Sequence, residues 1–385
     1  MRIVFLTFAF QHPDMRGSAR AYHLLRGLAP GHEVTLLALS EVPVPTEVRE
    51  DVASFVEQVE VFETGGRASG RRARHRAYLD GMARMRETLA LAHAKRPFDV
   101  AVLHGRSLLP VWKGIGGLPL VADICDADSM RIRKHAATAP LRRRPELLAY
   151  AALVRHRERG LARATPWVSF ISARDREAVM GPASRAAVIP NGVDLELWRR
   201  TTAAPTGGQR LVFSGVMDYR PNEDAAIVLT DGVLPLVRER VPGAEAVLVG
   251  RDPRPALLDR ASRPGVTITG YVEDIRPYLE QASLFVAPMR FASGQQNKVL
   301  EAMAMEVPVV TTPIVAAGME IDGTAAPLVV VEGTEAIAAA VARLLRDDGE
   351  RRRLAVAGRR FVEQHAVWAR SAEALEALCR AAAAG

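Results

Sequence analysis

Short apolar runs alternate with longer amphipathic stretches along the whole chain, which is the pattern of β-α units that build a buried parallel sheet. Between the first two apolar runs, residues 18–29 place Ala21, Leu24, Leu25 and Leu28 on one face of a helix. In the first half, strands are predicted at residues 3–9, 33–39, 99–103, 119–124, 167–171 and 186–189. This half is therefore predicted to form one Rossmann-like α/β domain.

The alternation stops in the middle of the chain and then restarts. Pro-Asn-Gly at 190–192 and the small, polar stretch 201–208 have the composition of a turn and a flexible connection. Further strands are predicted at residues 210–214, 244–249, 266–268, 284–287, 309–311 and 328–330, followed by a largely helical tail. We expect an N-terminal domain at 1–193, a C-terminal domain at 194–364, and a last segment at 365–385 whose helix packs back on the first domain.

Composition agrees with two globular domains and adds a basic surface. The 385 residues are 49% hydrophobic and 25% charged, and the net charge of +7 is carried mainly by arginine, with dense runs at 67–76 and 142–144. Aromatic residues do not interleave these runs, which favours a solvated surface over nucleic-acid binding. Contact with an anionic membrane surface or a phosphorylated substrate stays open.

The ends and the cysteines indicate a cytoplasmic protein without a metal centre. The apolar start, residues 1–10, has no small-residue cleavage site after it, and no stretch is long enough to cross a bilayer. Cys125 and Cys379 are far apart and lack metal-ligand spacing. We expect neither a metal nor a bound cofactor.

The segment 284–304 carries the clearest chemical signal, because an apolar strand leads through a polar loop into an amphipathic helix. A helix N-terminus presents unpaired N–H groups and partial positive charge, so a diphosphate fits there. Lys298 lies in the first turn and Glu301 about one turn further on. Lysine neutralises phosphate, whereas glutamate oxygens accept hydrogen bonds from ribose hydroxyls. The alternative is an exposed ion pair worth about 0.2–0.5 kcal/mol.

The run Lys-Val-Leu-Glu-Ala-Met-Ala-Met-Glu-Val-Pro-Val-Val-Thr-Thr at 298–312 resembles the nucleotide-sugar segment of retaining glycosyltransferases of family 4. Residues 188–194 resemble that family's interdomain junction, 213–215 its first donor-domain strand and glycine, and 270–274, around Val272, its loop beside the base. Residues 17–28 and 123–129 are similar to a bacterial branch associated with cell-surface and exopolysaccharide sugars. The resemblance implies the GT-B fold, with two Rossmann-like domains facing across a cleft.

The resemblance also implies a reaction. A sugar moves from a UDP- or GDP-linked donor to an acceptor hydroxyl with retention of configuration and without a compulsory metal. The acceptor stays open among polysaccharide intermediates, lipid-linked sugars and secondary-metabolite aglycones.

Glu301 corresponds to the second glutamate of the family's Glu-x7-Glu motif, which holds the ribose hydroxyls. The first glutamate falls at Ser293, and a serine cannot replace a carboxylate that accepts from two sugar hydroxyls. Backbone N–H groups of Gly294 and Gln295 are the alternative contacts to the sugar or phosphate.

The diphosphate clamp departs from the family as well. After Gly215 many relatives carry an arginine and a lysine, but here Arg220 is the one cation of the stretch 216–222. Arg220 is either a substitute clamp or a solvent-facing residue. For the leaving diphosphate, Lys298 is the first candidate and Arg290 the second.

Three candidates on the acceptor side lie near the first strands. Gly17, a candidate donor contact, sits where the family has a glycine-bearing loop beside the reaction centre, and the alternative is an ordinary turn glycine. Arg16 and Arg20 flank Gly17 as candidate anion contacts on the acceptor side. His104 follows the strand 99–103 at its carboxyl end, where ligands bind in open α/β sheets. A packing role is the alternative for His104.

Asp126 follows the strand 119–124 at its carboxyl end, where relatives often have a histidine. We expect this carboxylate at the reaction centre, where it accepts a sugar hydroxyl, orients the acceptor or receives its proton. The alternative is that Asp126 caps the next helix, and for Asp128 capping is the expectation.

Three other functions compete with the transferase. A nicotinamide-dependent dehydrogenase is disfavoured, because the loop after the first strand lacks Gly-x-Gly-x-x-Gly. A nucleotide-sugar epimerase of the same fold would use a similar donor pocket, and a catalytically silent binding partner would fit the departures at Ser293 and after Gly215.

Overall fold

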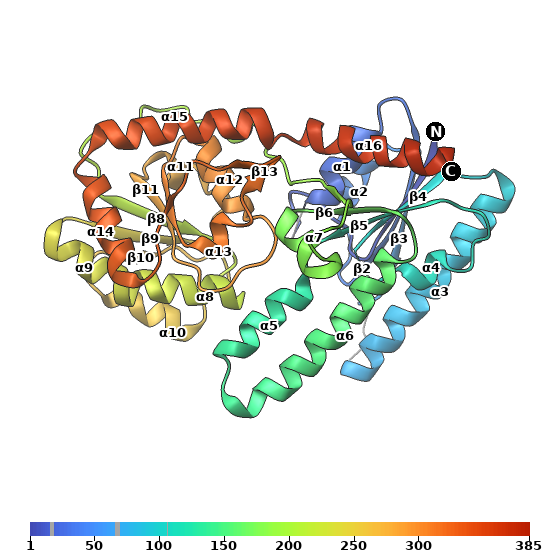
Figure 1. Ribbon diagram of the computed structural model, residues 1–385, viewed down its shortest axis with the longest axis horizontal. Helices are drawn as coiled ribbons and strands as arrows, with labels where there is room; N and C mark the ends of the chain where they lie inside the picture. The colour runs from blue at the N-terminus through green and yellow to red at the C-terminus, as the bar shows by residue number, and fades with distance from the viewer. Residues whose placement is uncertain (16–18, 66–69, 106) are drawn as a thin grey trace. The chain divides into compact units, whose positions relative to one another are not determined.

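The computed structural model describes residues 1–15, 19–65, 70–105 and 107–385. The chain divides into two compact units. The first contains Met1–Pro190 together with Trp368–Gly385, and the second contains Asn191–Val367. Each unit is built on one parallel sheet covered by helices (Figure 1).

The first unit has a seven-stranded parallel sheet in the order β3-β2-β1-β4-β5-β6-β7. Its strands are β1 (Arg2–Thr7), β2 (Glu33–Ser40), β3 (Gln58–Glu63), β4 (Val100–His104), β5 (Leu120–Cys125), β6 (Trp167–Phe170) and β7 (Ala187–Val188). The six predicted strand positions all coincide with strands. The edge strand β3 was missed because its residues alternate between polar and apolar and carry two glutamates, so no continuous apolar run marks it.

Helices cover both faces of this sheet. One core contains side chains of α1 (Arg20–Leu28), α2 (Thr46–Ala53) and α16 (Trp368–Ala384). The core on the other face contains side chains of α3 (Arg71–Lys95), α4 (Leu109–Trp112), α6 (Arg144–Ala162) and α7 (Ala173–Met180). The helix α5 (Asp128–Thr138) packs against α6. Successive residues of a strand point to opposite faces of the sheet. A continuous apolar run therefore supplies side chains to the cores on both faces.

The last helix, α16, belongs to the first unit. His23 of α1 stacks on Trp368, with ring centroids 4.4 Å apart. Gly27 lies so close to Ala372 that a Cβ atom on Gly27 would fall 2.2 Å from the Ala372 side chain. The absence of a side chain at Gly27 therefore lets the two helices approach each other closely.

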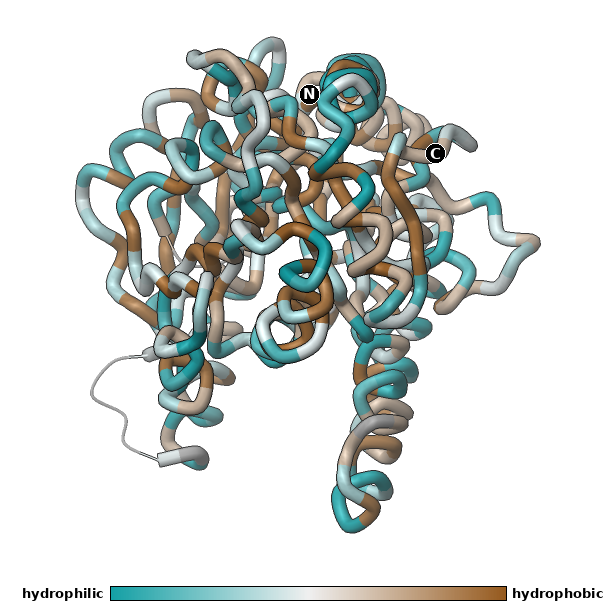
Figure 2. Tube along the Cα trace, turned by 90° about the vertical axis from the view of Figure 1, so that its left-hand side faces the viewer, coloured by the Kyte–Doolittle hydropathy of each residue, from teal (hydrophilic) through white to brown (hydrophobic). Residues whose placement is uncertain are grey.

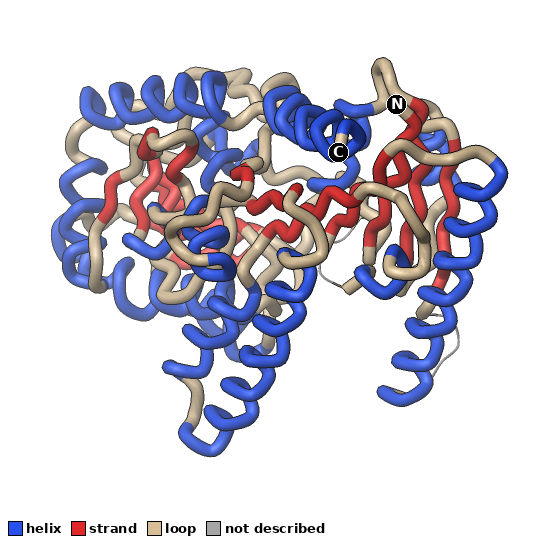
Figure 3. The backbone as a smooth tube through the Cα atoms, turned by 45° about the vertical axis from the view of Figure 1, so that its right-hand side comes forward, coloured by secondary structure: helices blue, strands red, loops and turns tan. Residues whose placement is uncertain are grey.

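The second unit has a six-stranded parallel sheet in the order β10-β9-β8-β11-β12-β15. Its strands are β8 (Arg210–Ser214), β9 (Glu245–Val249), β10 (Val266–Ile268), β11 (Leu284–Ala287), β12 (Val309–Thr311) and β15 (Val329–Val330). A small antiparallel pair, β13 (Glu320–Ile321) and β14 (Thr324–Ala325), was not predicted from the sequence. Figure 3 shows strands and helices of both units.

The helices of the second unit surround one continuous core. They are α8 (Arg220–Ile227), α9 (Leu234–Arg240), α10 (Pro255–Leu258), α11 (Arg276–Glu280), α12 (Asn297–Ala304), α13 (Pro313–Ala316), α14 (Thr334–Leu345) and α15 (Asp348–His365). A π-helical segment, Val228–Val233, joins α8 to α9. Among the described residues, no helix has the length and apolar character needed to span a bilayer.

Candidate functional site

Lys298 and Glu301 lie on α12, which begins directly after the loop that follows β11. The N-cap residue, Gln296, makes no side-chain capping hydrogen bond, so the first turn is not closed by its own cap. One face of α12 is buried through Val299, Leu300 and Met303. Lys298 and Glu301 are half-buried at the edge of that face, and no ion pair joins them among the interactions of the described residues. The alternative of an exposed ion pair is wrong.

The ammonium group of Lys298 is surrounded by residues from two other elements. Lys298 Nζ donates to Asn222 Oδ1 and lies 4.8 Å from the ring centroid of Phe213. Asn222 Nδ2 in turn donates to the Val216 carbonyl at 2.9 Å. Asn222 is on α8 and Phe213 on β8, so the lysine is fixed by segments about 80 residues away in sequence.

Gly215, directly after β8, is shaped by the same lysine. Its φ of +153° lies outside the range that side chains favour, and a Cβ atom there would fall 2.9 Å from Lys298 Nζ and 2.6 Å from Asn222 Nδ2. A side chain at this position would therefore displace both groups. The glycine leaves open the space beside the lysine.

Burial shifts both titrating groups of α12 towards neutrality. It lowers the pKa of Lys298 to about 7, against the opposing effect of Glu301. It raises the pKa of Glu301 to about 7, against the opposing effect of Lys298. The carboxylate of Glu301 receives no hydrogen bond from any described residue, so it is an acceptor without a protein donor. A ligand with phosphate oxygens and hydroxyl groups would give Lys298 a counter-charge and Glu301 hydrogen-bond donors.

The loop before α12 is tied down by hydrogen bonds. Gln295 Oε1 accepts from the Asn191 backbone N–H at 2.7 Å, and Asn191 Nδ2 donates to Asn297 Oδ1 at 2.7 Å. The Ser293 carbonyl accepts from Gln296 Nε2 at 2.9 Å. Ser293 and Gln295 are buried, and Gly294 has a φ of +60°. The Nε2 atom of Gln295 is buried without a hydrogen-bond partner in the described part of the chain.

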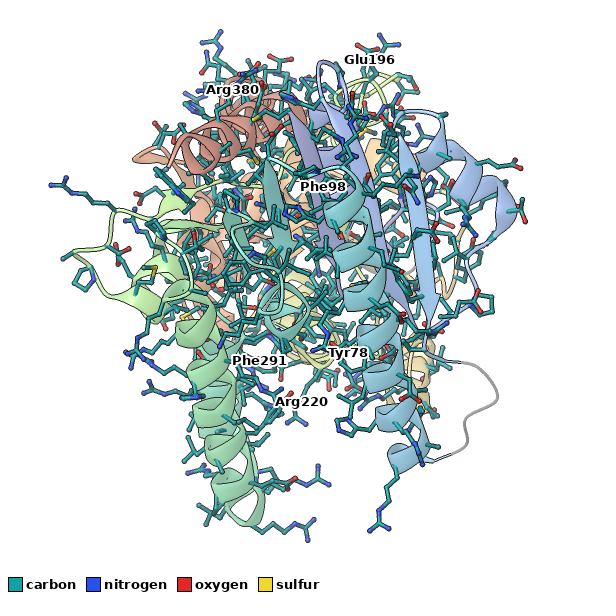
Figure 4. The ribbon with its side chains drawn as sticks, turned by 90° about the vertical axis from the view of Figure 1, so that its right-hand side faces the viewer. Tyr78, Phe98, Glu196, Arg220, Phe291 and Arg380 are labelled. Carbon is teal, nitrogen blue, oxygen red and sulfur yellow. The ribbon has the colours of Figure 1, made fainter. Side chains whose placement is uncertain are left out.

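The remaining donor-side candidates have different environments. Arg290 is paired with Asp224 of α8, with Arg290 Nε donating to Asp224 Oδ2 at 2.8 Å. Arg220 is the first residue of α8 and is exposed, and its side chain is labelled in Figure 4. Val272 packs partly buried against the core of the second unit, between the exposed Tyr271 and Glu273. The structure thus brings Arg290 to an acidic partner and leaves Arg220 at the surface.

In the first unit, a buried ion pair lies at the carboxyl ends of β4 and β5. Arg20 Nε donates to Asp123 Oδ2 and Arg20 Nη2 to Asp123 Oδ1, both at 3.0 Å. Ser169 Oγ also donates to Asp123 Oδ1, at 2.9 Å. Burial opposes ionisation of Asp123, but Arg20 and His104 outweigh it and hold its pKa below its ordinary value. The expectation that Arg20 flanks a loop as an anion contact needs correction, because its guanidinium is 2% exposed and binds an internal carboxylate.

His104 extends this network rather than facing solvent. His104 Nδ1 lies 2.8 Å from Asp123 Oδ2, and Gln11 Nε2 lies 3.0 Å from His104 Nε2. Gln11 Oε1 accepts from the Ala21 backbone N–H at 2.8 Å. A neutral ring that donates through Nδ1 and accepts at Nε2 satisfies all of these contacts. His104 therefore has the packing and hydrogen-bonding surroundings that were its alternative interpretation.

Three ligand-type atoms, from His104, Asp123 and Cys125, lie within 4.8 Å of one another. Both oxygens of Asp123 already accept from Arg20, and a cation would sit against that guanidinium. Burial, followed by the charge of Asp123, raises the pKa of the Cys125 thiol, which keeps it from acting as a thiolate ligand. The donor set thus fits a hydrogen-bonded network better than a metal site.

Asp126 comes directly after β5, at a distorted strand end. The register of β5 shifts between Asp123 and Cys125, and Cys125 has a φ of +63°. Such irregularities redirect the side chains that follow. Burial, followed by the charges of Asp175 and Asp128, raises the pKa of Asp126 to about 7. Its Oδ1 atom is buried without a hydrogen-bond partner in the described part of the chain.

The N-terminus of α5 is capped by residues from two other helices. The Ala127 backbone N–H donates to Asp175 Oδ1 at 3.0 Å, and the Ser129 N–H donates to Glu158 Oε1 at 3.1 Å. The N-cap is Ala127, and no side-chain cap comes from it. The expectation that Asp128 caps this helix is wrong, because Asp128 is its first residue and pairs with Arg131.

Two candidate residues cannot be compared with the structure, and three residues of the polar clusters were not predicted from the sequence. Arg16 and Gly17 lie outside the described residues. Sequence reasoning missed Asn222 and Phe213 beside Lys298, and Asp123 beside Arg20. A buried aspartate inside the apolar strand 119–124 was the available signal for Asp123, because a charge there needs a partner. Asn222 and Phe213 had no local signal.

Comparison with known families gives a partial match. Residues 208–347 match the family model Glycosyl transferases group 1. A phosphatidyl-myo-inositol mannosyltransferase of Mycolicibacterium smegmatis is 29% identical over 189 residues, 47% of this chain and 48% of the relative. A GDP-mannose-dependent alpha-(1-6)-phosphatidylinositol monomannoside mannosyltransferase of Mycobacterium tuberculosis is 28% identical over 228 residues, 53% of this chain and 59% of the relative. The chain thus matches about half the length of these relatives.

Solved structures are similar over nearly the whole chain. Sucrose-phosphate synthase of Thermosynechococcus elongatus has a TM-score of 0.75 at 18% identity and covers 99% of both chains. HepE of Anabaena, in complex with UDP and glucose, has a TM-score of 0.66 at 15% identity, with 97% of this chain and 98% of that chain covered. These likenesses show the fold, which is GT-B.

Proposed function

We propose that this protein is a glycosyltransferase that moves a sugar from a nucleotide-sugar donor to an acceptor hydroxyl with retention of configuration. The observation that carries the proposal is the pair Lys298 and Glu301 at the start of α12, within the segment 208–347 that matches Glycosyl transferases group 1. The two mannosyltransferase relatives support transfer chemistry. The family resemblance supports retention.

In this proposal the donor lies against the second unit. The first turn of α12 and Lys298 hold the diphosphate, while Glu301 accepts hydrogen bonds from the ribose hydroxyls. Phosphate next to Lys298 favours its protonated form and reverses the effect of burial on its pKa. The space beside Gly215 gives the phosphate access to the ammonium group. The base is uracil or guanine, since one relative is named for GDP-mannose and one similar structure holds UDP.

Negative charge grows on the diphosphate as the glycosidic bond breaks, and preplaced positive charge stabilises it. Lys298 and the dipole of α12 are the groups that supply this charge, and Arg290 follows as the second candidate. Because protein groups suffice, we propose that turnover needs no metal. Asp126-Ala127-Asp128 has the spacing of an Asp-x-Asp motif, but Asp128 is paired with Arg131.

Asp126 is our candidate for handling the acceptor. Its position after β5, its raised pKa and its unpartnered buried oxygen suit a group that exchanges a proton with an acceptor hydroxyl near neutral pH. The acceptor class is a hydroxyl compound, and the names of both curated relatives place phosphatidylinositol lipids first among the compounds to test.

A donor panel tests the proposal. UDP- and GDP-sugars are screened by thermal shift, where a ligand at about 100 times its dissociation constant stabilises the fold by about 2.7 kcal/mol. The donor that binds is then incubated with lipid and saccharide acceptors, and proton NMR of the fresh product reports its anomeric configuration. An inverted product would contradict retention. A new sugar nucleotide formed from donor alone would identify an epimerase instead, and activity lost to a chelator and restored by magnesium would contradict the metal-free reaction.

A further inference from the structure

The helices α5 and α6 form a long hairpin that extends away from the sheet of the first unit (Figure 1). We call residues 128–162 the basic hairpin. Its turn consists of Ala139, Pro140 and the short 3-10 helix Leu141–Arg143. Ile132, Ala151 and Val154, with Leu147 beside them, form a small core that is separate from the two cores of the sheet. The hairpin is thus held together by its own contacts.

The basic hairpin has a strong excess of positive charge. Lysine and arginine outnumber aspartate and glutamate in it by nine to three. Asp128 is paired with Arg131, and Glu158 is buried and bonded to Ser129. Glu146 is the exposed acidic residue of the hairpin. The exposed charges of the hairpin are therefore almost all positive, and the turn carries Arg142 and Arg143 in exposed positions.

Apolar side chains are exposed between these cations. Leu141, in the turn, is 77% exposed, and on the adjoining half of α6 Leu148, Tyr150 and Leu153 are 49%, 51% and 46% exposed. In the stretch 145–153 the exposed residues other than Glu146 are uncharged. In Figure 2 the hairpin shows hydrophobic and hydrophilic residues side by side along its length. Three large aliphatic side chains are thus exposed to water next to an arginine run. Such a surface indicates a partner that contacts both the apolar side chains and the positive charges.

The start of α3 has the same character. Arg72, Arg74 and Arg76 are exposed, and Leu79 follows them at 49% exposure. Figures 3 and 4 show this end of α3 extending to the same side of the first unit as the basic hairpin. The described arginines at the start of α3 and those of the hairpin thus lie on one side of the first unit.

We propose that the basic hairpin docks the protein onto an anionic lipid bilayer, with Arg142 and Arg143 at the lipid head groups and Leu141, Leu148 and Leu153 at the acyl boundary. Cations beside exposed aliphatic side chains are the combination that binds an anionic interface. A second copy of the chain would bring like charges together. Nucleic acid would pair its phosphates with the arginines, but it offers no apolar phase to the exposed leucines.

Vesicle flotation of the full chain tests this docking surface. The vesicles contain phosphatidylcholine alone, or phosphatidylcholine with 30% phosphatidylglycerol, a composition on the order of natural anionic membranes. One variant combines Arg142→Glu and Arg143→Glu, and a second combines Leu141→Ser, Leu148→Ser and Leu153→Ser. The matched control combines Arg353→Glu and Arg360→Glu, which are exposed arginines of the second unit. Thermal melting checks that each variant is folded.

We expect the wild type and the control to float with the anionic vesicles, and much less with the neutral ones. The arginine variant should bind roughly 25-fold more weakly or worse, because each of the two cations near an anionic surface strengthens binding by roughly fivefold. The serine variant should also bind at least about tenfold more weakly. Wild-type protein that ignores anionic vesicles, or a folded arginine variant that still binds them, would overturn the proposal.

A serine variant that binds as well as the wild type would also overturn it, and would favour an acidic protein or polyanion as the partner. Binding to vesicles does not depend on sugar transfer. A protein that binds vesicles without transferring any sugar would thus contradict the proposed function and leave the docking surface intact.

Discussion

The polar clusters of the two units differ in how many of their charged groups have hydrogen-bond or ion-pair partners in the protein. In the first unit, Asp123 accepts from Arg20, His104 and Ser169, and the far side of His104 contacts Gln11. In the second unit, the described residues give Glu301 no donor, and Lys298 has the neutral Asn222 and the ring of Phe213 instead of a carboxylate.

The difference separates residues that hold the fold from residues that await a ligand. A buried charge that is fully paired stabilises only the arrangement around it, whereas a half-buried charge without a counter-charge weakens the fold until a ligand arrives. Asp126 belongs with the second group although it lies three residues from Asp123, because its buried oxygen has no partner among the described residues. Position at a strand end therefore does not by itself identify a ligand-binding group.

The largest effect on stability is expected from a change in the fully paired cluster around Asp123. Asp123→Asn leaves the buried Arg20 without its counter-charge, so the free energy of unfolding should fall by about 3–5 kcal/mol. Urea unfolding measures this, and Asp80→Asn, on the exposed side of α3, is the matched control. Loss of donor affinity in a fully stable Asp123→Asn variant would place Asp123 with the ligand-binding groups instead.

Asp126→Asn should not lower the free energy of unfolding, because α5 is capped by Asp175 and Glu158 and not by Asp126, and because the raised pKa of Asp126 means that its ionisation opposes folding. Turnover should fall roughly a hundredfold or more, the usual range for loss of general-base catalysis. In the wild type the rate should fall below about pH 7, where Asp126 becomes protonated, and the variant should lose this limb of the pH profile. A near-normal transfer rate in the variant would rule out an essential carboxylate.

Glu301→Ala should weaken nucleotide-sugar binding by about 1.5–3 kcal/mol, because the ribose loses a charged acceptor. Calorimetric titration of the folded variant measures the loss. Glu306→Ala, just beyond the end of α12, is the control. Unchanged donor affinity would contradict the role of Glu301, and full turnover of Lys298→Ala at saturating donor would contradict the electrostatic role of Lys298.

The smallest expected effect is on the free energy of unfolding of the ligand-free protein. The pKa of Glu301 in the folded protein, about 7, is above its ordinary value of 4.5, so ionisation of Glu301 opposes folding. The penalty is absent below pH 4.5, grows as the pH rises and is complete above about pH 7. Glu301→Gln should therefore raise the free energy of unfolding at pH 8 by an amount on the order of 1–2 kcal/mol, and leave it unchanged at pH 4. A variant that is destabilised at pH 8 would show that a protein group pairs with this carboxylate.

The sequence by itself determined the architecture and one half of the candidate donor site. Apolar periodicity located twelve strand positions that all coincide with strands, because a buried parallel strand reads as a local apolar run. The junction of β11 and α12 was equally local, so Lys298 and Glu301 could be placed one turn apart on one helix.

The tertiary structure alone decided which polar groups meet. Arg20 and Asp123 are 103 positions apart, and Lys298 and Asn222 are 76 apart. These pairs form because the sheet order places β4 between β1 and β5 and places β8 beside β11, and no local pattern encodes that order. The cap of α5 followed the same rule, since Asp175 and Glu158 come from α7 and α6. Local periodicity fixes where a strand or helix forms, whereas burial and partners of a charge depend on the elements packed around it.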